Sequence, residues 1–141
     1  MKSLNILLVE DNDGDILLIS ETLNEGGEIG RIDVVRDGKA AIDYFSSFDA
    51  TEDPIHLVLL DLNLPKMNGL DVLKFIKSNK NLKHLPVIIL TTSSSHKDIL
   101  QSYQNYANCY VVKPYDANVF AEVINRLKYL WLHIASIPKI R

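Results

Sequence analysis

Apolar residues gather in five short runs along the chain, at 6–9, 32–35, 57–60, 87–90 and 109–112. Four of these runs lack the polar alternation of a strand that has one face in water. Continuous runs rich in Val, Ile and Leu are typical of strands in a parallel sheet that is covered on both faces. The pattern therefore predicts buried strands of a parallel sheet.

The segments between these runs carry apolar residues at helical spacing. The first three segments carry Ile16, Ile19 and Leu23, then Ala41, Ile42 and Phe45, then Leu70, Leu73 and Ile76. The fourth segment, 96–105, is more polar, so we expect its helix to lie loosely against the sheet. The last segment follows Pro114 and has a wide apolar stripe, so we expect its helix to pack firmly.

The alternation of strand and helix predicts an α/β fold, with a doubly wound parallel sheet and right-handed crossovers. A sheet of five strands with five helices favours the flavodoxin-like strand order 2-1-3-4-5, in which the winding reverses between the first and third strands. Ligands of such folds bind at the carboxyl ends of the strands, at this reversal. We expect one domain over residues 1–141, with a short C-terminal extension from about residue 132.

Acidic residues stand at the two strand ends that flank the reversal. Glu10 and Asp11 follow the first run, and Asp61 follows the third. Two like charges about 4 Å apart repel by roughly 4 kcal/mol at an effective dielectric near 20. Three converging carboxylates therefore have raised pKa values or bind a cation, and an all-oxygen site suits Mg²⁺ better than zinc or copper. A free carboxylate beside such a metal, with Asp61 as the candidate, is a nucleophile for phosphoryl transfer.

The ends of the fourth and fifth strands add a hydroxyl group and a cation. Thr91 or Thr92 ends the fourth strand, and Lys113 follows the fifth. A hydroxyl donor and an ammonium opposite a metal are suited to binding phosphoryl oxygens. Each residue alone has a plainer interpretation, because Asp11 and Thr92 fit helix N-caps, Asp61 fits a turn and a lone Lys is usually a surface residue. Their conjunction at four strand ends favours a site.

Charge and composition exclude other kinds of partner. A net charge of -3, from 15 basic and 18 acidic residues without a basic cluster, argues against a nucleic-acid surface. The start, MKSLNILLVED, is too short and too acidic for a signal peptide or a membrane span. The single cysteine, Cys109, cannot form an internal disulfide, so we expect a cytoplasmic protein that binds no membrane.

Four segments together resemble the receiver domain of two-component response regulators: ILLVEDNDGD, VLLDLNLPKMNGLDVL, VIILTTSS and CYVVKPY. The resemblance covers essentially the whole chain. It implies a phosphorelay in which an aspartate accepts a phosphoryl group from a histidine kinase with Mg²⁺, or Mn²⁺, as the cofactor. It also implies a signalling switch that assists its own phosphorylation and dephosphorylation, as opposed to an enzyme with turnover.

The resemblance assigns a metal site and a phosphoacceptor. It implies that Asp61 is the phosphoacceptor and that the metal is bound by Glu10, Asp11, Asp61 and the backbone carbonyl of Asn63. Glu10 stands where many receivers have Asp, which moves one carboxylate by a methylene and implies that it acts through water.

The resemblance also assigns the residues that respond to the phosphoryl group. Thr91 matches the hydroxyl residue that turns toward this group, and Lys113 matches the lysine that pairs with it. Tyr110 matches the aromatic residue that changes rotamer together with the hydroxyl. The resemblance further implies a cis peptide bond between Lys113 and Pro114, because the cis form costs little free energy before a proline.

A narrower resemblance, through LNLPK, LTTS and YLWL, is to stand-alone receivers that serve phytochrome-type histidine kinases. Only one helix and a short tail follow Pro114, so we expect output by contact without an attached output domain. The tail RLKYLWLHIASIPKIR is more apolar than a solvated terminus needs. We expect a homodimer through the fourth helix, fifth strand, last helix and tail, with Tyr110 and Trp131 at the interface. The alternative is that Trp131 folds back as core.

Three other classes of protein share parts of this pattern. A flavodoxin needs a loop rich in Gly and hydroxyl groups after the first strand, whereas EDNDGD would repel phosphate. A haloacid-dehalogenase-type phosphatase needs a second Asp two residues after its nucleophile, where this chain has Asn63. A P-loop nucleotidase needs Gly-x-x-x-x-Gly-Lys, which the sequence lacks.

Overall fold

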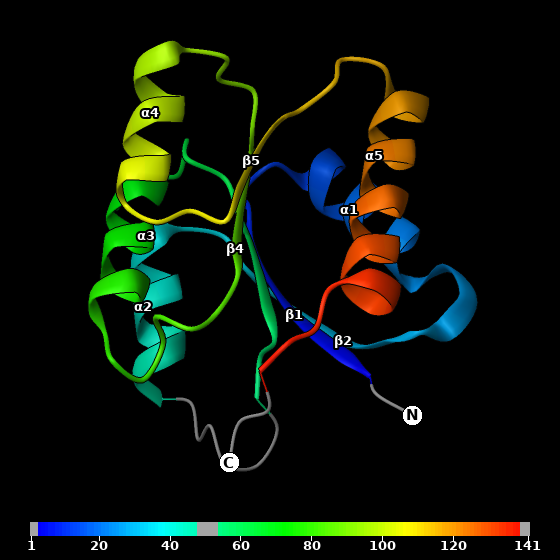
Figure 1. Cartoon of the computed structure of the whole chain (residues 1–141). Coiled ribbons are helices and arrows are strands. Elements are labelled where there is room, and N and C mark those ends of the chain that lie inside the picture. The colour runs from blue at the N-terminus through cyan, green and yellow to red at the C-terminus, as the bar shows by residue number, and fades with distance from the viewer. Residues whose placement is uncertain (1–2, 48–53, 139–141) are drawn as a thin grey trace.

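Five parallel strands form one sheet with helices on both faces (Figure 1), in a computed structural model that describes residues 3–47 and 54–138. The strands are β1 (Leu4–Val9), β2 (Ile29–Val35), β3 (Leu57–Leu60), β4 (Val87–Thr91) and β5 (Cys109–Val112). The helices are α1 (Asp13–Asn24), α2 (Gly38–Ser47), α3 (Gly69–Ser78), α4 (His96–Gln104) and α5 (Ala117–Tyr129). The strand order β2-β1-β3-β4-β5 confirms the predicted flavodoxin-like fold.

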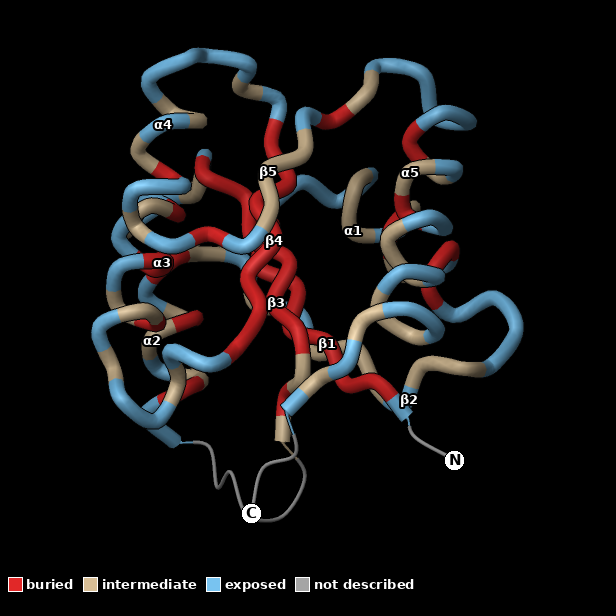
Figure 2. Tube along the Cα trace, viewed as in Figure 1, coloured by how far each residue is buried: buried red, intermediate tan, exposed pale blue. Residues whose placement is uncertain are grey.

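The two faces of the sheet bury separate apolar clusters. Helices α1 and α5 cover one face, and α2, α3 and α4 cover the other (Figure 1). Along β1, Leu7 and Val9 pack under α2 and α3, whereas Ile6 and Leu8 pack under α1 and α5. Every residue of β1, β3 and β4 is buried (Figure 2), which explains why their sequences show no polar alternation.

The helices differ in how much they bury, as the sequence predicted. Helix α4 buries only Ser102, whereas α5 buries Phe120 and Ile124 in the core between α5 and the sheet. Strands β2 and β5 form the two edges of the sheet and are less buried than the central strands. The face beside β5 and α4 therefore has few buried side chains to restrain it.

The chain after α5 folds back on the sheet. A π-helical turn, Leu130–Ile134, follows α5, and Trp131 and Ile137 pack against the cluster beneath α1 and α5. Lys128 donates hydrogen bonds to the backbone carbonyls of Thr22 and Glu25, at 3.1 and 2.9 Å, at the end of α1. Trp131 is therefore partly buried against this cluster, which agrees with the alternative in which it folds back onto its own domain. The last residues of the predicted tail, 139–141, lie outside the described residues.

Within the described ranges, residues 3–47 and 54–138, no helix is both long enough and apolar enough to cross a lipid bilayer.

Candidate functional site

The candidate site lies at the carboxyl ends of the strands, which are at the top in Figure 1. The hydrogen-bond ladder continues one residue beyond the strands, because Glu10 N–H donates to Val35 at 3.0 Å and Asp61 N–H donates to Val9 at 3.0 Å. These backbone bonds hold the first residue after β1 beside the first residue after β3. The pairing of the strands thus brings together two carboxylates that are far apart in sequence.

Glu10, Asp11 and Asp61 form a carboxylate triad. One carboxylate oxygen from each lies within 4.8 Å of the others, as the sequence predicted. Glu10 and Asp61 are buried, whereas Asp11 is exposed. Three oxygen donors with one side open to water fit a hard divalent cation that keeps part of its hydration shell. The donor set therefore fits Mg²⁺ or Mn²⁺, and it contains none of the nitrogen or sulfur ligands typical of zinc.

Lys113 enters the same site from the end of β5. Its ammonium donates to Glu10 Oε1 at 2.7 Å, to Asp15 Oδ2 at 2.8 Å and to Asp61 Oδ2 at 2.9 Å. Its side chain is only 4% exposed. An ammonium group has three protons, so these carboxylates saturate it.

Asp15 is a member of the site that the sequence analysis missed. It lies in the first turn of α1, where an acidic residue is also explained by the helix dipole. The backbone N–H of Asp15 donates to the side chain of Asn12, the N-cap residue, at 2.9 Å. The sequence carried only a weak signal, because an acidic residue three positions after an Asn N-cap is typical of any first helical turn.

Burial and charge act in opposite directions at this site. Burial raises the pKa of the Glu10 carboxyl to about 7, and the hydrogen bond from Lys113 offsets this effect only in part. Burial by itself would lower the pKa of the Lys113 ammonium, but the hydrogen bonds to its three carboxylates outweigh burial and raise the pKa. The lysine therefore stays charged and neutralises part of the acidic site.

Thr91 and Asn63 lie on the side of Asp61 that faces β4. The backbone N–H of Asn63 donates to Asp61 Oδ1 at 3.1 Å, and the amide nitrogen of Asn63 is 3.5 Å from Thr91 Oγ1. Thr91 is fully buried, at the end of β4. The structure thus brings the predicted hydroxyl residue to the phosphoacceptor candidate through Asn63. Thr92, the other candidate of the sequence, is exposed.

Tyr110 connects the β4–α4 loop to β5. Its hydroxyl donates to the backbone carbonyl of Ser93 at 2.9 Å, and its backbone N–H donates to the hydroxyl of Tyr103 at 3.1 Å. Ser93 in turn donates to Asp98 at 2.6 Å, in the first turn of α4. The position of the Tyr110 ring is therefore coupled to the start of α4.

The prediction of a cis peptide bond between Lys113 and Pro114 is wrong. Over the described parts of the chain no peptide bond is cis, so Lys113–Pro114 is trans. The two isomers of a bond before proline differ by only about 0.5–1 kcal/mol, so local packing decides between them.

Comparisons with known proteins agree with this geometry. Residues 6–125 match the family described as the response regulator receiver domain. The probable methanogenesis regulatory protein FilR2 of Methanothrix harundinacea is 41% identical over 128 residues, which are 90% of this chain and 83% of that protein.

Two solved structures are similar over nearly the whole chain. The phosphorylated cyanobacterial phytochrome response regulator RcpA has a TM-score of 0.92 and 38% identity, and the match covers 98% of this chain and 100% of that one. The Mn²⁺-bound form of response regulator Rcp1, a Synechocystis protein, has a TM-score of 0.88 and 36% identity, and the match covers 96% and 99% of the two chains.

Proposed function

Because the chain belongs to the response regulator receiver domain family, we propose that Asp61 accepts a phosphoryl group from a histidine kinase and that the protein signals by changed contacts. The observation that carries this proposal is the position of Asp61. Its carboxylate is buried, lies 2.9 Å from the Lys113 ammonium and shares a divalent-metal triad with Glu10 and Asp11. In the proposed transfer, an Asp61 oxygen forms a bond to phosphorus while the bond from phosphorus to the kinase histidine nitrogen breaks.

The metal in this proposal is Mg²⁺, with Mn²⁺ as a substitute. Glu10, Asp11 and Asp61 would bind it with the backbone carbonyl of Asn63, and a bound divalent cation supplies charge stabilisation for phosphoryl oxygens. The side chains of this chain would supply the rest. Lys113 bonds Asp61, and Thr91 lies beside Asn63, whose backbone N–H bonds Asp61, so both would reach the same oxygens. With these groups the protein assists its own phosphorylation and dephosphorylation.

Phosphorylation of Asp61 is tested by intact-mass measurement after treatment with a small phosphodonor and Mg²⁺. Wild type gains one phosphoryl group, and Asp61→Asn gains none. Asp71→Asn is the control, because it also removes one carboxylate, from the exposed first turn of α3, and should be modified like wild type. Modification of Asp61→Asn, or modification undiminished by a chelator, contradicts the proposal.

The proposed switch links the phosphoryl group to Thr91 and Tyr110. Phosphorylation adds a charge of about -1.5 to -2, and a hydrogen bond from Thr91 to a charged acceptor contributes roughly 1.5–3 kcal/mol. That free energy is enough to reverse the equilibrium between two conformations whose free energies differ by a similar amount. Tyr110, bonded to the Ser93 carbonyl, follows Thr91 and shifts the start of α4.

Variants at two adjacent threonines test this switch. Thr91→Ala should abolish phosphorylation-dependent partner binding, and Thr92→Ala, at an exposed position, should retain it. Both variants should still be phosphorylated at Asp61. Phosphorylation-dependent binding that survives in Thr91→Ala contradicts the coupling.

The kinase partner that we propose is of the phytochrome type. This rests on RcpA, a phytochrome response regulator that aligns along its whole length with 98% of this chain. The same alignment supports one receiver domain over the part of the chain that it covers, and the lone Cys109 fits a cytoplasmic location. Phosphotransfer profiling against the histidine kinases of the host tests this, and preferential transfer from a kinase without a light-sensing module contradicts it.

The proposed output is association through the face made by α4, β5 and α5. This face exposes large apolar side chains, namely Leu100, Tyr103, Val112, Tyr115 and Val119. Exposed apolar patches are typical of interfaces. Tyr110 lies within this face, whereas Trp131 packs inward and contributes only by supporting α5.

Sedimentation of charge variants tests association in both phosphorylation states. Leu100→Glu should keep the protein monomeric when phosphorylated, while wild type dimerises. Leu17→Glu, at a position on α1 that is also exposed, is the control and should dimerise. A wild type that stays monomeric in both states contradicts homodimerisation.

A further inference from the structure

Asp15 is the one partner of the buried Lys113 ammonium that is partly open to water. Its side chain is 27% exposed, compared with 2% for Glu10 and 7% for Asp61. It is also the partner that comes from a helix, because α1 begins two residues earlier at Asp13. The three partners of Lys113 therefore differ in how readily each can release the ammonium.

We propose that Asp15 is a positioning residue. It accepts the third hydrogen bond of the Lys113 ammonium until an oxygen of a phosphoryl group on Asp61 accepts that bond in its place. The inference rests on the proposed function of Asp61. It assigns to Asp15 a competition with the phosphoryl oxygens for the ammonium, and thus an influence on how strongly the site retains that group.

The three protons of the Lys113 ammonium set the terms of this competition. Lys113 has three protons and three carboxylate partners, at 2.7, 2.8 and 2.9 Å. When Asp61 is phosphorylated its carboxyl group loses its charge, so the Lys113 proton that it held passes to a phosphoryl oxygen. The other charged phosphoryl oxygens then compete with Glu10 and Asp15 for the two remaining protons. A buried carboxylate that loses its partner bears the full cost of an unpaired charge, whereas a carboxylate near the surface is solvated by water. Asp15 is therefore the partner that is released.

Removal of Asp15 should leave Lys113 in place. Glu10 and Asp61 still bind the ammonium from two sides, and both are buried. The backbone bond from Asp15 to the Asn12 cap does not use the Asp15 side chain, so the start of α1 is retained. The expected result is a higher affinity of the site for the phosphoryl group, because the variant lacks the Asp15 carboxylate, which competes for Lys113 and repels the phosphoryl charge.

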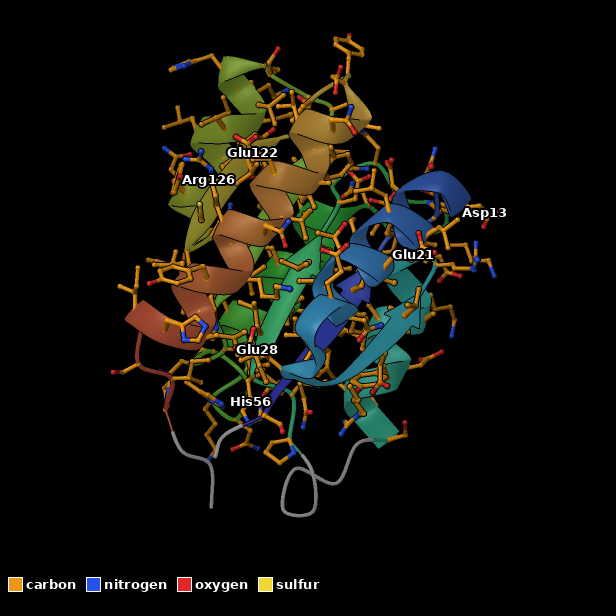
Figure 3. The ribbon with its side chains drawn as sticks, turned by 90° about the vertical axis from the view of Figure 1, so that its right-hand side faces the viewer. Asp13, Glu21, Glu28, His56, Glu122 and Arg126 are labelled. Carbon is orange, nitrogen blue, oxygen red and sulfur yellow. The ribbon has the colours of Figure 1, made fainter. Side chains whose placement is uncertain are left out.

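Beryllofluoride is a tetrahedral analogue of the phosphoryl group, and its binding in the presence of Mg²⁺ measures this affinity. We expect Asp15→Ala to bind it about tenfold more tightly than wild type in a ¹⁹F NMR titration, the change expected when a charge-assisted competitor is removed. Asp13→Ala is the matched control, and its affinity should stay within about twofold of wild type. Figure 3 shows Asp13 at the start of α1. Its side chain is 84% exposed and pairs with Arg36, whereas Lys113 bonds Glu10, Asp15 and Asp61. Equal affinities of the two variants, or weaker binding by Asp15→Ala, would overturn the inference.

A second measurement separates this inference from the proposed function. In ¹⁵N NMR spectra of the unphosphorylated protein, the Lys113 ammonium should exchange slowly with water in wild type and in Asp13→Ala. It should exchange much faster in Asp15→Ala, whereas a purely structural role of Asp15 would lower the melting temperature and leave this signal unchanged. If wild type fails to bind beryllofluoride, the proposed function fails, and the ammonium signal still decides whether Asp15 holds Lys113. An unchanged signal in Asp15→Ala overturns the inference.

Discussion

Gly69 lies so close to the backbone carbonyl of Asp61 that a Cβ atom at position 69 would overlap the carbonyl oxygen. Its backbone N–H also donates to the carbonyl of Leu62 at 2.9 Å, which brings the start of α3 against the end of β3. The first turn of α3 is thus fitted to the backbone of the phosphoacceptor candidate. This contact ties the packing of a helix to the geometry of the site.

Gly69→Ala should lower the free energy of unfolding by about 2 kcal/mol, because the added methyl group meets backbone atoms that cannot turn aside. Gly14→Ala is the control, since a Cβ there has room and Ala suits a helix better than Gly. Urea unfolding monitored by circular dichroism measures both. Equal stabilities of the two variants would show that α3 can move away from Asp61 at little cost.

Lys113→Met should destabilise the metal-free protein by roughly 3 kcal/mol, because Glu10 and Asp61 are left buried without a counter-ion. Mg²⁺ should then stabilise the variant more than wild type, since the cation replaces the lost ammonium charge. Unfolding in urea with chelator and with Mg²⁺ measures this. Lys39→Met, at an exposed position, should resemble wild type in both buffers. A metal effect of the same size in Lys113→Met and wild type contradicts this account of the site.

The pH dependence of stability should reveal the hydrogen bond from Tyr44 to Asp33, which is 2.7 Å long. Burial by itself would raise the pKa of Asp33, but the hydrogen bond from Tyr44 and the charge of Arg31 outweigh burial and lower the pKa below 3.8. The stability gained is therefore complete above the ordinary pKa of Asp and is lost as the pH falls through the lower, folded-state value.

Tyr44→Phe should cost about 1 kcal/mol between pH 5 and 7, and this difference from wild type should shrink below about pH 4. Burial, together with the hydrogen bond to Asp33, raises the pKa of Tyr44 to about 12, so its hydroxyl remains protonated throughout this range. Urea unfolding of both proteins at pH 7, 5 and 3.5 gives the comparison. A difference that grows as the pH falls would contradict the role of Asp33.

Ser102→Ala should stabilise the protein by about 1 kcal/mol. The Ser102 side chain is fully buried on α4, and its hydroxyl finds no hydrogen-bond partner among the described residues. Replacement by Ala removes an unpaired polar group and improves helix propensity. Thermal or urea unfolding measures this, with Ser78→Ala as the control, because that hydroxyl bonds the carbonyl of Phe75. A loss of stability in Ser102→Ala would indicate a hydrogen bond that forms in solution.

The sequence by itself determined the sheet and most of the site. Runs such as LVLL at 57–60 have no polar alternation because both faces of the sheet are covered, and this requires helices between parallel strands. Once the strand order follows, the residues after β1 and β3 must meet, so the sequence alone places Glu10 beside Asp61. These predictions depend on periodicity and strand ends, which are local properties of the chain.

Only the tertiary structure decided the partners of side chains that several elements share. Asp15 had a sufficient local explanation at the start of a helix, and its bond to Lys113 appears only when α1 and β5 are placed in space. The sequence also left undecided whether Trp131 packs inward, because an apolar tail can cover its own sheet or a partner. The trans bond before Pro114 was also undecidable, since the two isomers differ by less free energy than local packing contributes.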